Sequence, residues 1–148
     1  MDGVLDLINE ELIEAFENVM KIEALYMDRE YKIKLSMTEV HTIAAIGIAE
    51  LKSMGEIARR LHITVGTLTV AITNLVKKGY VERYKSEEDR RIVKVGLTKQ
   101  GKKIYDIHEK FHHELANALV KGFNVEEKQI VARALANLGE FIAIRYEI

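Results

Sequence analysis

The chain of 148 residues contains no cysteine and no proline. Without cysteine it has no disulfides, thiolate metal sites or cysteine nucleophiles, and no thiolate with which to sense oxidants. Without proline, nothing forces a break in long helices. The sequence also lacks a glycine-rich phosphate loop and a strand–turn–serine elbow, which are common signatures of enzymes. We therefore expect a binding protein without catalytic activity or cofactor.

Long hydrophobic runs are missing as well. No stretch approaches the roughly 20 consecutive apolar residues of a membrane span, and the segment 1–3 lacks the basic flank of a secretory signal. Apolar residues make up 48% of the chain and charged residues 30%, which is typical of one globular, helix-rich domain. We expect a cytoplasmic protein that makes no membrane contact.

The net charge of −1 is the sum of two unlike parts. Residues 59–103 hold twelve lysines and arginines against four acids, a local charge of +8, so the rest of the chain carries −9. A basic segment on an acidic scaffold is typical of a module that binds a polyanion. A solvated charged surface would give the same count, so charge alone does not decide between the two.

Helical periodicity and capping residues predict the first two helices. Apolar residues at steps of three and four over 5–26 indicate a long amphipathic helix. Ser36 or Thr38 is expected to begin a second helix that runs to about Ala49, with Glu39 at its positive end.

Two short helices are expected next. Ser53 and Glu56 have the spacing of a capping box before an apolar run, and Thr64 is suited to begin a further helix that Gly79 would end. The outer face of that further helix carries small polar and methyl-bearing residues instead of long charged ones. These residues are Thr67, Thr69, Val70, Thr73 and Asn74.

The segment after Gly79 has β-forming character. Residues 80–84 and 91–97 read as two strands joined by the charged turn 86–90, with Val93, Val95 and Leu97 on one side of the second strand. The order of two short helices and a basic β-hairpin predicts a winged helix-turn-helix.

Each part of this arrangement suits double-stranded DNA. The small outer face can enter the major groove, where hydroxyls bond base edges and methyl groups meet thymine methyls. Gly66 allows the backbone to approach a phosphate, and basic side chains would position the duplex. The residues expected at the interface are Ser53, Thr64, Gly66, Thr67, Thr69, Val70, Thr73, Asn74, Lys77, Lys78, Arg83, Asp89, Arg90, Arg91 and Lys94.

The most specific signal is the pair Asp89 and Arg91 at the tip of the hairpin. An acid two residues before an arginine can orient the guanidinium, and an arginine on a narrow ribbon suits the electronegative minor groove. The alternative is an ordinary surface salt bridge in a charged turn.

These segments resemble the MarR family of dimeric winged-helix transcriptional regulators. The similarity lies in residues 67–69, 74–83 and 89–98, and it extends over essentially the whole chain. The resemblance implies a homodimer on palindromic DNA. It divides the single domain 1–148 into a DNA-binding lobe at 35–100 and a helical dimerisation lobe at 1–34 and 101–148.

Two further helices are expected in that second lobe. One runs from Thr98 to near Gly122 and the other starts at about Val125. The first and last helices carry more apolar residues than one small core needs, which favours pairing of two chains through them. The alternative is that both helices complete the core of a monomer.

Within the family the chain is most similar to the repressors of fatty-acid biosynthesis genes in Gram-positive bacteria. Segments 40–47, 64–69, 86–91 and 108–112 carry this narrower resemblance. It implies that acylated acyl carrier protein, or its long acyl chain, is the corepressor. Residues suited to an adaptable apolar pocket are Phe16, Met20, Met27, Met37, His41, His108, Phe111 and His112. A row of this kind is also typical of a plain core.

A response to zinc or to another small molecule is the competing hypothesis. His108 and His112 are four residues apart and share one helical face, and His41 with Glu39 could complete a set of nitrogen and oxygen ligands. Some zinc sensors of the same family place histidines similarly. The favoured hypothesis remains the response to an acyl chain, and it includes no metal site.

Overall fold

The computed structural model describes residues 3–147. In chain order its elements are α1 Gly3–Tyr31, α2 Met37–Ile46, β1 Lys52–Ser53, α3 Met54–Leu61, α4 Val65–Lys77, β2 Val81–Lys85, β3 Val93–Leu97, α5 Lys99–Leu119 and α6 Val125–Tyr146. The mainly helical class with a small β wing is confirmed. Within the described range, no helix is both long and apolar enough to cross a membrane.

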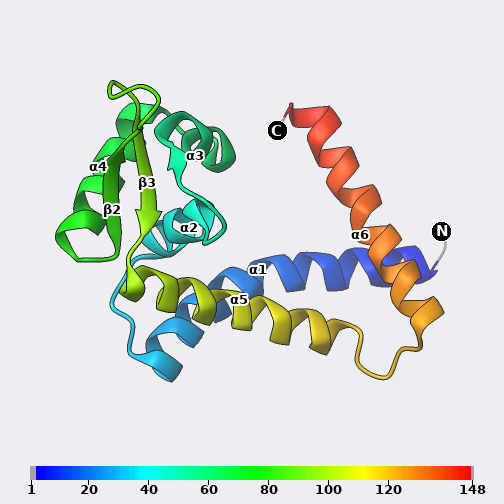
Figure 1. The fold of residues 1–148 in the computed structure, drawn as a ribbon. Coiled ribbons are helices and arrows are strands. Elements are labelled where there is room, and N and C mark those ends of the chain that lie inside the picture. Colours follow the sequence, from blue (N-terminus) through cyan, green and yellow to red (C-terminus); the bar gives the residue numbers. More distant parts are fainter. Residues whose placement is uncertain (1–2, 148) are drawn as a thin grey trace.

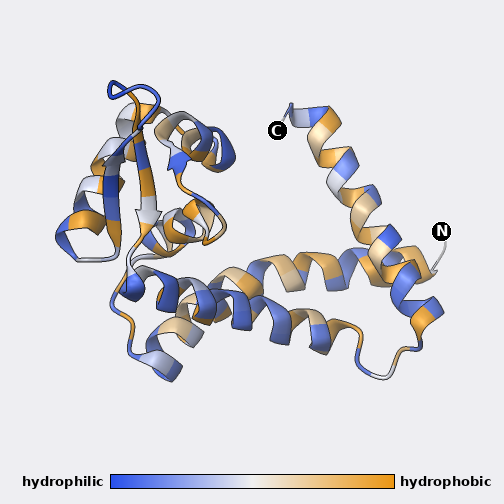
Figure 2. Ribbon diagram, viewed as in Figure 1, coloured by the Kyte–Doolittle hydropathy of each residue, from blue (hydrophilic) through white to orange (hydrophobic). Residues whose placement is uncertain are grey.

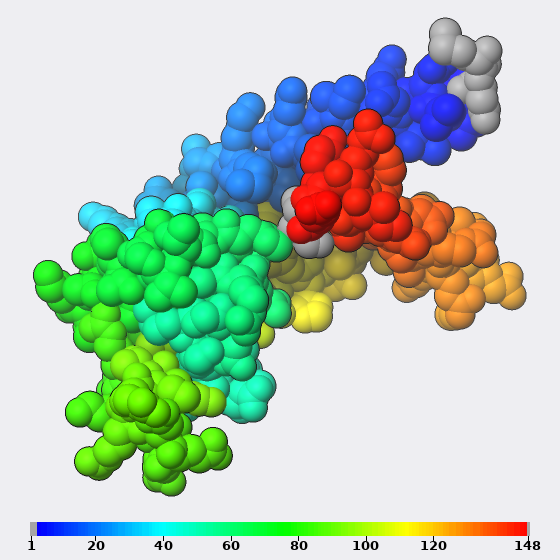
Figure 3. All heavy atoms as spheres, turned by 90° about the horizontal axis from the view of Figure 1, so that it is seen from above, coloured from blue at the N-terminus to red at the C-terminus, as the bar shows by residue number. Residues whose placement is uncertain are grey.

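The elements between α2 and β3 form one lobe, and the long helices form the rest of the molecule. Figure 1 shows α1 and α5 running side by side, with α6 rising from the far end of α5 near the N-terminal part of α1. Seen from above, α3, α4 and the β2–β3 hairpin gather at one end of the molecule, remote from the start of α1 (Figure 3). The exposed hairpin tip is therefore free to reach a large partner.

The sheet has three strands in the order β1-β3-β2, all antiparallel. The predicted hairpin is confirmed as β2 and β3, with Val81 opposite Leu97 and Lys85 opposite Val93. Strand β1 was not predicted. It contributes only two residues, which pair with Val95 and Lys94, and two residues are too few to show an alternating pattern.

Helix α2 begins at a predicted position but ends earlier than predicted. Of the two candidates for its N-cap, Ser36 takes this role, and it forms a reciprocal capping box with Glu39. The helix ends at Ile46 instead of Ala49, because Gly47 has a positive φ of 68° and its N–H bonds back to the carbonyl of Ile43.

The other predicted caps are confirmed. Ser53 forms a capping box with Glu56 at the start of α3, and Thr64 accepts a hydrogen bond from the N–H of Thr67 at the start of α4. Thr98 caps α5 in the same way. Each such cap satisfies an otherwise unpaired N–H and contributes about 1 kcal/mol to the stability of its helix.

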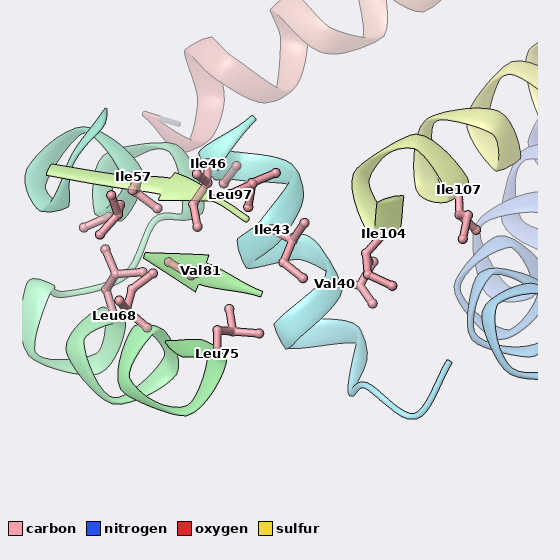
Figure 4. Packing of buried hydrophobic residues seen from close by; sticks show 14 of the residues in the cluster. Val40, Ile43, Ile46, Ile57, Leu68, Leu75, Val81, Leu97, Ile104 and Ile107 are labelled. Carbon is pink, nitrogen blue, oxygen red and sulfur yellow. The ribbon is translucent and has the colours of Figure 1, made fainter. Parts of the chain in front are cut away.

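The core of the lobe lies between the helices and the sheet (Figure 4). Helix α4 directs Leu68, Ile72 and Leu75 into it, where they meet side chains of the other elements. Among the described residues, the hydrophobic side chains with no exposed surface are Val40, Ile43, Ile46, Ile57, Leu68, Ile72, Leu75 and Val95. Complete burial of one such side chain contributes about 1.5–3 kcal/mol.

Strand β3 enters this core at only one end. Val95 and Leu97 are buried, whereas Val93 is 37% exposed. Val93 pairs with Lys85 at the turn end of the hairpin, beyond the helices that cover the base of the wing. Of the three side chains predicted on one side of this strand, only the two nearer α5 therefore reach the core.

The junction between the wing and α5 requires glycine at position 101. A Cβ atom there would lie 2.1 Å from the carbonyl oxygen of Tyr80, which accepts the N–H of Thr98. Backbone contact this close fixes the base of the wing against the first turn of α5.

Removing core volume from α4 should destabilise the protein. We expect Leu68→Ala to lower the free energy of unfolding by about 2–5 kcal/mol, measured by urea denaturation, because it leaves a cavity in a closed core. Val70→Ala on the exposed side of the same helix should change the free energy of unfolding by less than about 0.5 kcal/mol. Equal losses for both variants would contradict this orientation of α4.

Candidate functional site

The exposed side of α4 is the first part of the candidate interface. Gly66, Thr69, Val70 and Asn74 lie on the surface opposite the buried leucines, and the side chain of Val70 is 63% exposed. A Cβ atom at Gly66 would meet only the Thr64 hydroxyl at 3.9 Å, so the backbone is accessible there. Short side chains form this face, and no long side chain projects from it before Lys77.

The hydroxyl groups of α4 are engaged by its own backbone. Thr69 donates to the carbonyl of Val65 and Thr73 donates to the carbonyl of Thr69, each at 2.8 Å. At the first turn, the hydroxyl of Thr64 donates to that of Thr67 at 2.9 Å. From the sequence we predict that these hydroxyls bond base edges. In the structure the protons of Thr69 and Thr73 are already used.

Two cations predicted to contact DNA phosphates also have partners within the protein. Arg83 on β2 donates from Nη2 to Oγ1 of Thr73 at 2.7 Å, which ties the wing to α4. Lys78, the C-cap of α4, lies 2.6 Å from Oε1 of Glu39 on α2. These contacts hold α4 against both of its neighbours.

The tip of the wing presents Arg91 on the side chain of Asp89. The backbone N–H and Nε of Arg91 donate to Oδ1 of Asp89 at 3.0 and 3.1 Å, and Nη2 donates to Oδ2 at 3.1 Å. These hydrogen bonds hold the pKa of Asp89 below its usual range. The Arg91 side chain is 90% exposed, so the carboxylate orients it without burying it. The predicted geometry of this pair is confirmed.

The remaining predicted residues surround these two elements. Ser53 caps α3 and stands opposite Lys94 of β3, while Lys77 ends α4 and Arg90 lies in the turn beside Arg91. Figure 2 shows the hydrophilic character of the hairpin tip above a more apolar lobe. The exposed face of α4 and the tip of the wing thus belong to one lobe.

A second cluster lies where α1, α2 and α5 meet. Glu23 of α1 is only 3% exposed, and its Oε1 lies 3.0 Å from Nε2 of His41 on α2. Nε2 of His108 on α5 forms a very short contact with the same oxygen, and Nε2 of His112 lies 3.5 Å from it. The Nε2 atoms of His108 and His112 are 3.1 Å apart. One carboxylate oxygen and three ring nitrogens therefore converge.

Glu39 was the wrong carboxylate for this cluster. Its two oxygens bind the N–H of Ser36 and the ammonium of Lys78, because it serves as the N3 residue of the α2 capping box. Glu23 supplies the carboxylate that was predicted to come from Glu39. A signal was present in the sequence, since Glu23 stands four residues after Val19 and three before Tyr26 on the otherwise apolar inner face of α1.

Burial and hydrogen bonding have opposite effects on the pKa values of Glu23 and His108. Burial by itself raises the pKa of Glu23, but hydrogen bonds and charge from His41 and His108 outweigh it and lower the pKa below its usual value. Burial lowers the pKa of His108 in spite of its contact with Glu23. Among the described residues, Nδ1 of His108 has no hydrogen-bond partner. The result is an ionised carboxylate beside a neutral imidazole, the protonation states that metal ligands need.

An apolar cavity of about 480 Å³ lies between α1, α5 and α6. Its volume falls within the range of small-molecule sites. The residues that line it are Leu12, Ala15, Phe16, Val19, His112, Leu115, Ala116, Ala118, Leu119, Leu135 and Leu138.

Only Phe16 and His112 of the eight predicted pocket residues line this cavity. Met27 and Phe111 are buried, with Met27 in the core and the ring of Phe111 against Tyr26. His41 and His108 belong to the cluster around Glu23. Met37 packs against the core, and Met20 is exposed on α1. The sequence could not place these residues, because the cavity depends on how α6 returns toward α1.

A helix-turn-helix followed by a basic wing defines a winged-helix DNA-binding protein. Comparison with known proteins specifies the class. The sequence profile of the MarR family matches residues 35–93. The helix-turn-helix transcriptional regulator YfiV of Bacillus subtilis is 33% identical over 72% of this chain and 67% of its own length. The regulator PchR of the same organism is 30% identical over 72% of this chain, and the match spans 65% of PchR.

A solved structure is similar over nearly the full length. The crystal structure of Streptococcus pneumoniae FabT in complex with DNA superposes with a TM-score of 0.83 at 36% identity, over 93% of this chain and 96% of that one. The chain therefore belongs to the MarR family. It is a DNA-binding transcriptional regulator, and members of this family are not enzymes.

The buried carboxylate should matter for stability. We expect Glu23→Gln to lower the free energy of unfolding by about 1–3 kcal/mol in urea denaturation, because the neutral amide oxygen is a weaker acceptor than the carboxylate for the imidazoles that converge on it. Glu17→Gln, an exposed change on the same helix, is the control and should cost less than about 0.5 kcal/mol. A loss no larger at position 23 than at position 17 would contradict the packing of the cluster.

Proposed function

We propose that this protein is a dimeric repressor of fatty-acid biosynthesis genes that binds a palindromic operator, with a long-chain acylated acyl carrier protein as corepressor. The observation that carries the DNA-binding part is the exposed Arg91, held by Asp89 at the tip of a wing beside α4. The similarity to FabT, whose solved structure contains DNA, supports the narrower assignment.

On DNA, α4 would lie in the major groove and Arg91 in the adjacent minor groove. Thr67, Thr69, Val70, Thr73 and Asn74 would face the bases. The candidates for phosphate contacts are Ser53, Thr64, Gly66, Lys77, Lys78, Arg83, Arg90 and Lys94. Lys78 and Arg83 already contact Glu39 and Thr73, so they would approach the phosphates from fixed positions.

Exposed apolar side chains on α1 and α6 support a homodimer. Leu5 and Ile8 near the start of α1, and Leu135, Phe141 and Ile144 on α6, are all more than half exposed. A monomer would leave this surface in water, whereas a second copy would cover it. A two-fold pair also suits DNA, because its two recognition helices can reach half-sites about 34 Å apart. Segments 1–34 and 101–148 would then form the dimerisation lobe, and 35–100 the DNA-binding lobe.

The apolar cavity is the proposed site of the acyl chain. Its lining is almost wholly aliphatic and comes from α1, α5 and α6, the helices assigned to dimerisation. An acidic carrier protein needs basic groups nearby, and Arg29, Lys32 and Lys34 are exposed at the end of α1 and in the following loop. A ligand that binds the DNA-competent arrangement better than the other would tighten operator binding.

A zinc-responsive regulator is the second candidate, and the Glu23 cluster favours it. Oε1 of Glu23 and ring nitrogens of His41 and His108 lie within 4.8 Å of one another, with His112 beside them. Three imidazoles and one carboxylate form a set of ligands that suits a tetrahedral zinc ion. The ion would cross-link α1, α2 and α5, and would therefore fix the lobe that carries α4.

Replacing Arg91 by alanine should weaken operator binding. We expect at least about a tenfold loss of affinity and a smaller dependence of affinity on salt, measured by fluorescence anisotropy with a palindrome selected from random DNA. Lys121→Ala removes an equal charge beyond the end of α5 and should change the affinity less than twofold. If Arg91→Ala leaves both affinity and salt dependence unchanged, the wing does not contact DNA.

The corepressor can be identified with the same operator. We expect long-chain acyl carrier protein to tighten binding at least about fivefold, and unloaded carrier protein, zinc and chelator to have no effect. Ala116→Phe puts a ring into the cavity and should remove the response to the acylated carrier while operator binding persists.

The zinc hypothesis predicts the opposite pattern. Zinc or chelator would change the affinity, the acylated carrier would not, and His41→Gln would abolish the zinc response. Such a result would replace the lipid proposal with metal sensing.

A further inference from the structure

Base recognition by α4 is limited by the hydrogen bonds that its threonines already make. The hydroxyl proton of Thr69 is used on the carbonyl of Val65, and that of Thr73 on the carbonyl of Thr69. Oγ1 of Thr73 also accepts from Arg83. These hydroxyls cannot donate to a base edge without giving up a helix contact that costs free energy to break.

The exposed surface is correspondingly apolar at its centre. Thr69 and Val70 are adjacent and exposed, and Val65, one turn earlier, is 48% exposed. Because the hydroxyl of Thr69 donates its proton to the backbone, this side chain can offer DNA its methyl group and, through Oγ1, an acceptor, but no donor. Among the four bases, only thymine offers a methyl group in the major groove, so this surface matches thymine.

We infer that α4 reads its operator chiefly through thymine methyl groups, with Thr69 and Val70 as the specificity-determining residues. In this role Thr69 acts as a methyl-bearing residue, not as a hydrogen-bond donor. Thr73 is a positioning residue that holds Arg83 of the wing. The inference rests on the proposed placement of α4 in the major groove, and it specifies which chemical group of the DNA is recognised there.

Two substitutions at position 69 separate the methyl group from the hydroxyl. Thr69→Val keeps the methyl and removes the hydroxyl, and we expect its operator affinity to stay within about twofold of the original. Thr69→Ser keeps the hydroxyl and removes the methyl, and we expect a loss of about three- to fivefold, the effect of leaving one methyl contact unmade. Thermal unfolding of both variants checks that α4 is intact.

The methyl group can also be removed from the DNA, because uracil differs from thymine only in lacking this group. Uracil is placed at each thymine of the selected operator in turn. At one or two positions we expect uracil to lower the operator affinity of the original protein three- to fivefold. For Thr69→Ser, uracil at the same positions should cause no further loss of affinity. Val70→Ala, which should be as stable as the original, is expected to behave in the same way at a neighbouring thymine.

Two outcomes would overturn the inference. One is that Thr69→Val loses affinity while Thr69→Ser retains it, which would mean that the hydroxyl reads a base. The other is that uracil is tolerated at every position. In either case, a tenfold loss with Arg91→Ala would still support operator binding through the wing. If that loss is absent too, the wing does not contact DNA, and the proposed placement of this lobe on the operator is wrong.

Discussion

The burial of one side of α4 is the constraint on which the DNA-binding lobe depends. Leu68, Ile72 and Leu75 recur at helical spacing and are fully buried, so the rotation of this helix about its own axis is fixed. The opposite side is exposed as a direct consequence. Arg83 and Lys78 then bind the helix laterally to β2 and α2, which leaves little freedom for the exposed face to tilt.

The wing is built on a different principle. Its base is fixed by buried Val81, Val95 and Leu97, and by the close approach of Gly101 to Tyr80. Its tip has no core, and order there comes from backbone hydrogen bonds within the turn and from the contacts between Asp89 and Arg91. A charged side chain is thus oriented at the end of a ribbon without being taken out of water, so the orientation costs no desolvation.

Signals within a few residues of one another could be read from the sequence, whereas contacts between distant segments could not. Ser53, Thr64 and Thr98 were recognised as caps because a cap needs only its own helix. The assignment of Glu39 to the histidine cluster was wrong. Its capping box with Ser36 is a local signal that was overlooked, and its second partner, Lys78, is 39 residues away. Strand β1 was missed for the related reason that it exists only by pairing with β3. The apolar cavity could not be placed either, because its walls come from three helices whose angles no periodicity encodes.

His112 is part of both the apolar cavity and the cluster around Glu23. One part of its ring lines the apolar cavity, and its Nε2 lies 3.1 Å from His108 and 3.5 Å from Glu23. Glu23 in turn contacts His41 on α2, the helix that is bonded through Glu39 to the end of α4. The wall of the cavity and α4 are therefore separated by a short series of side-chain contacts. A displacement of this one imidazole would therefore change the contacts of the buried Glu23 carboxylate.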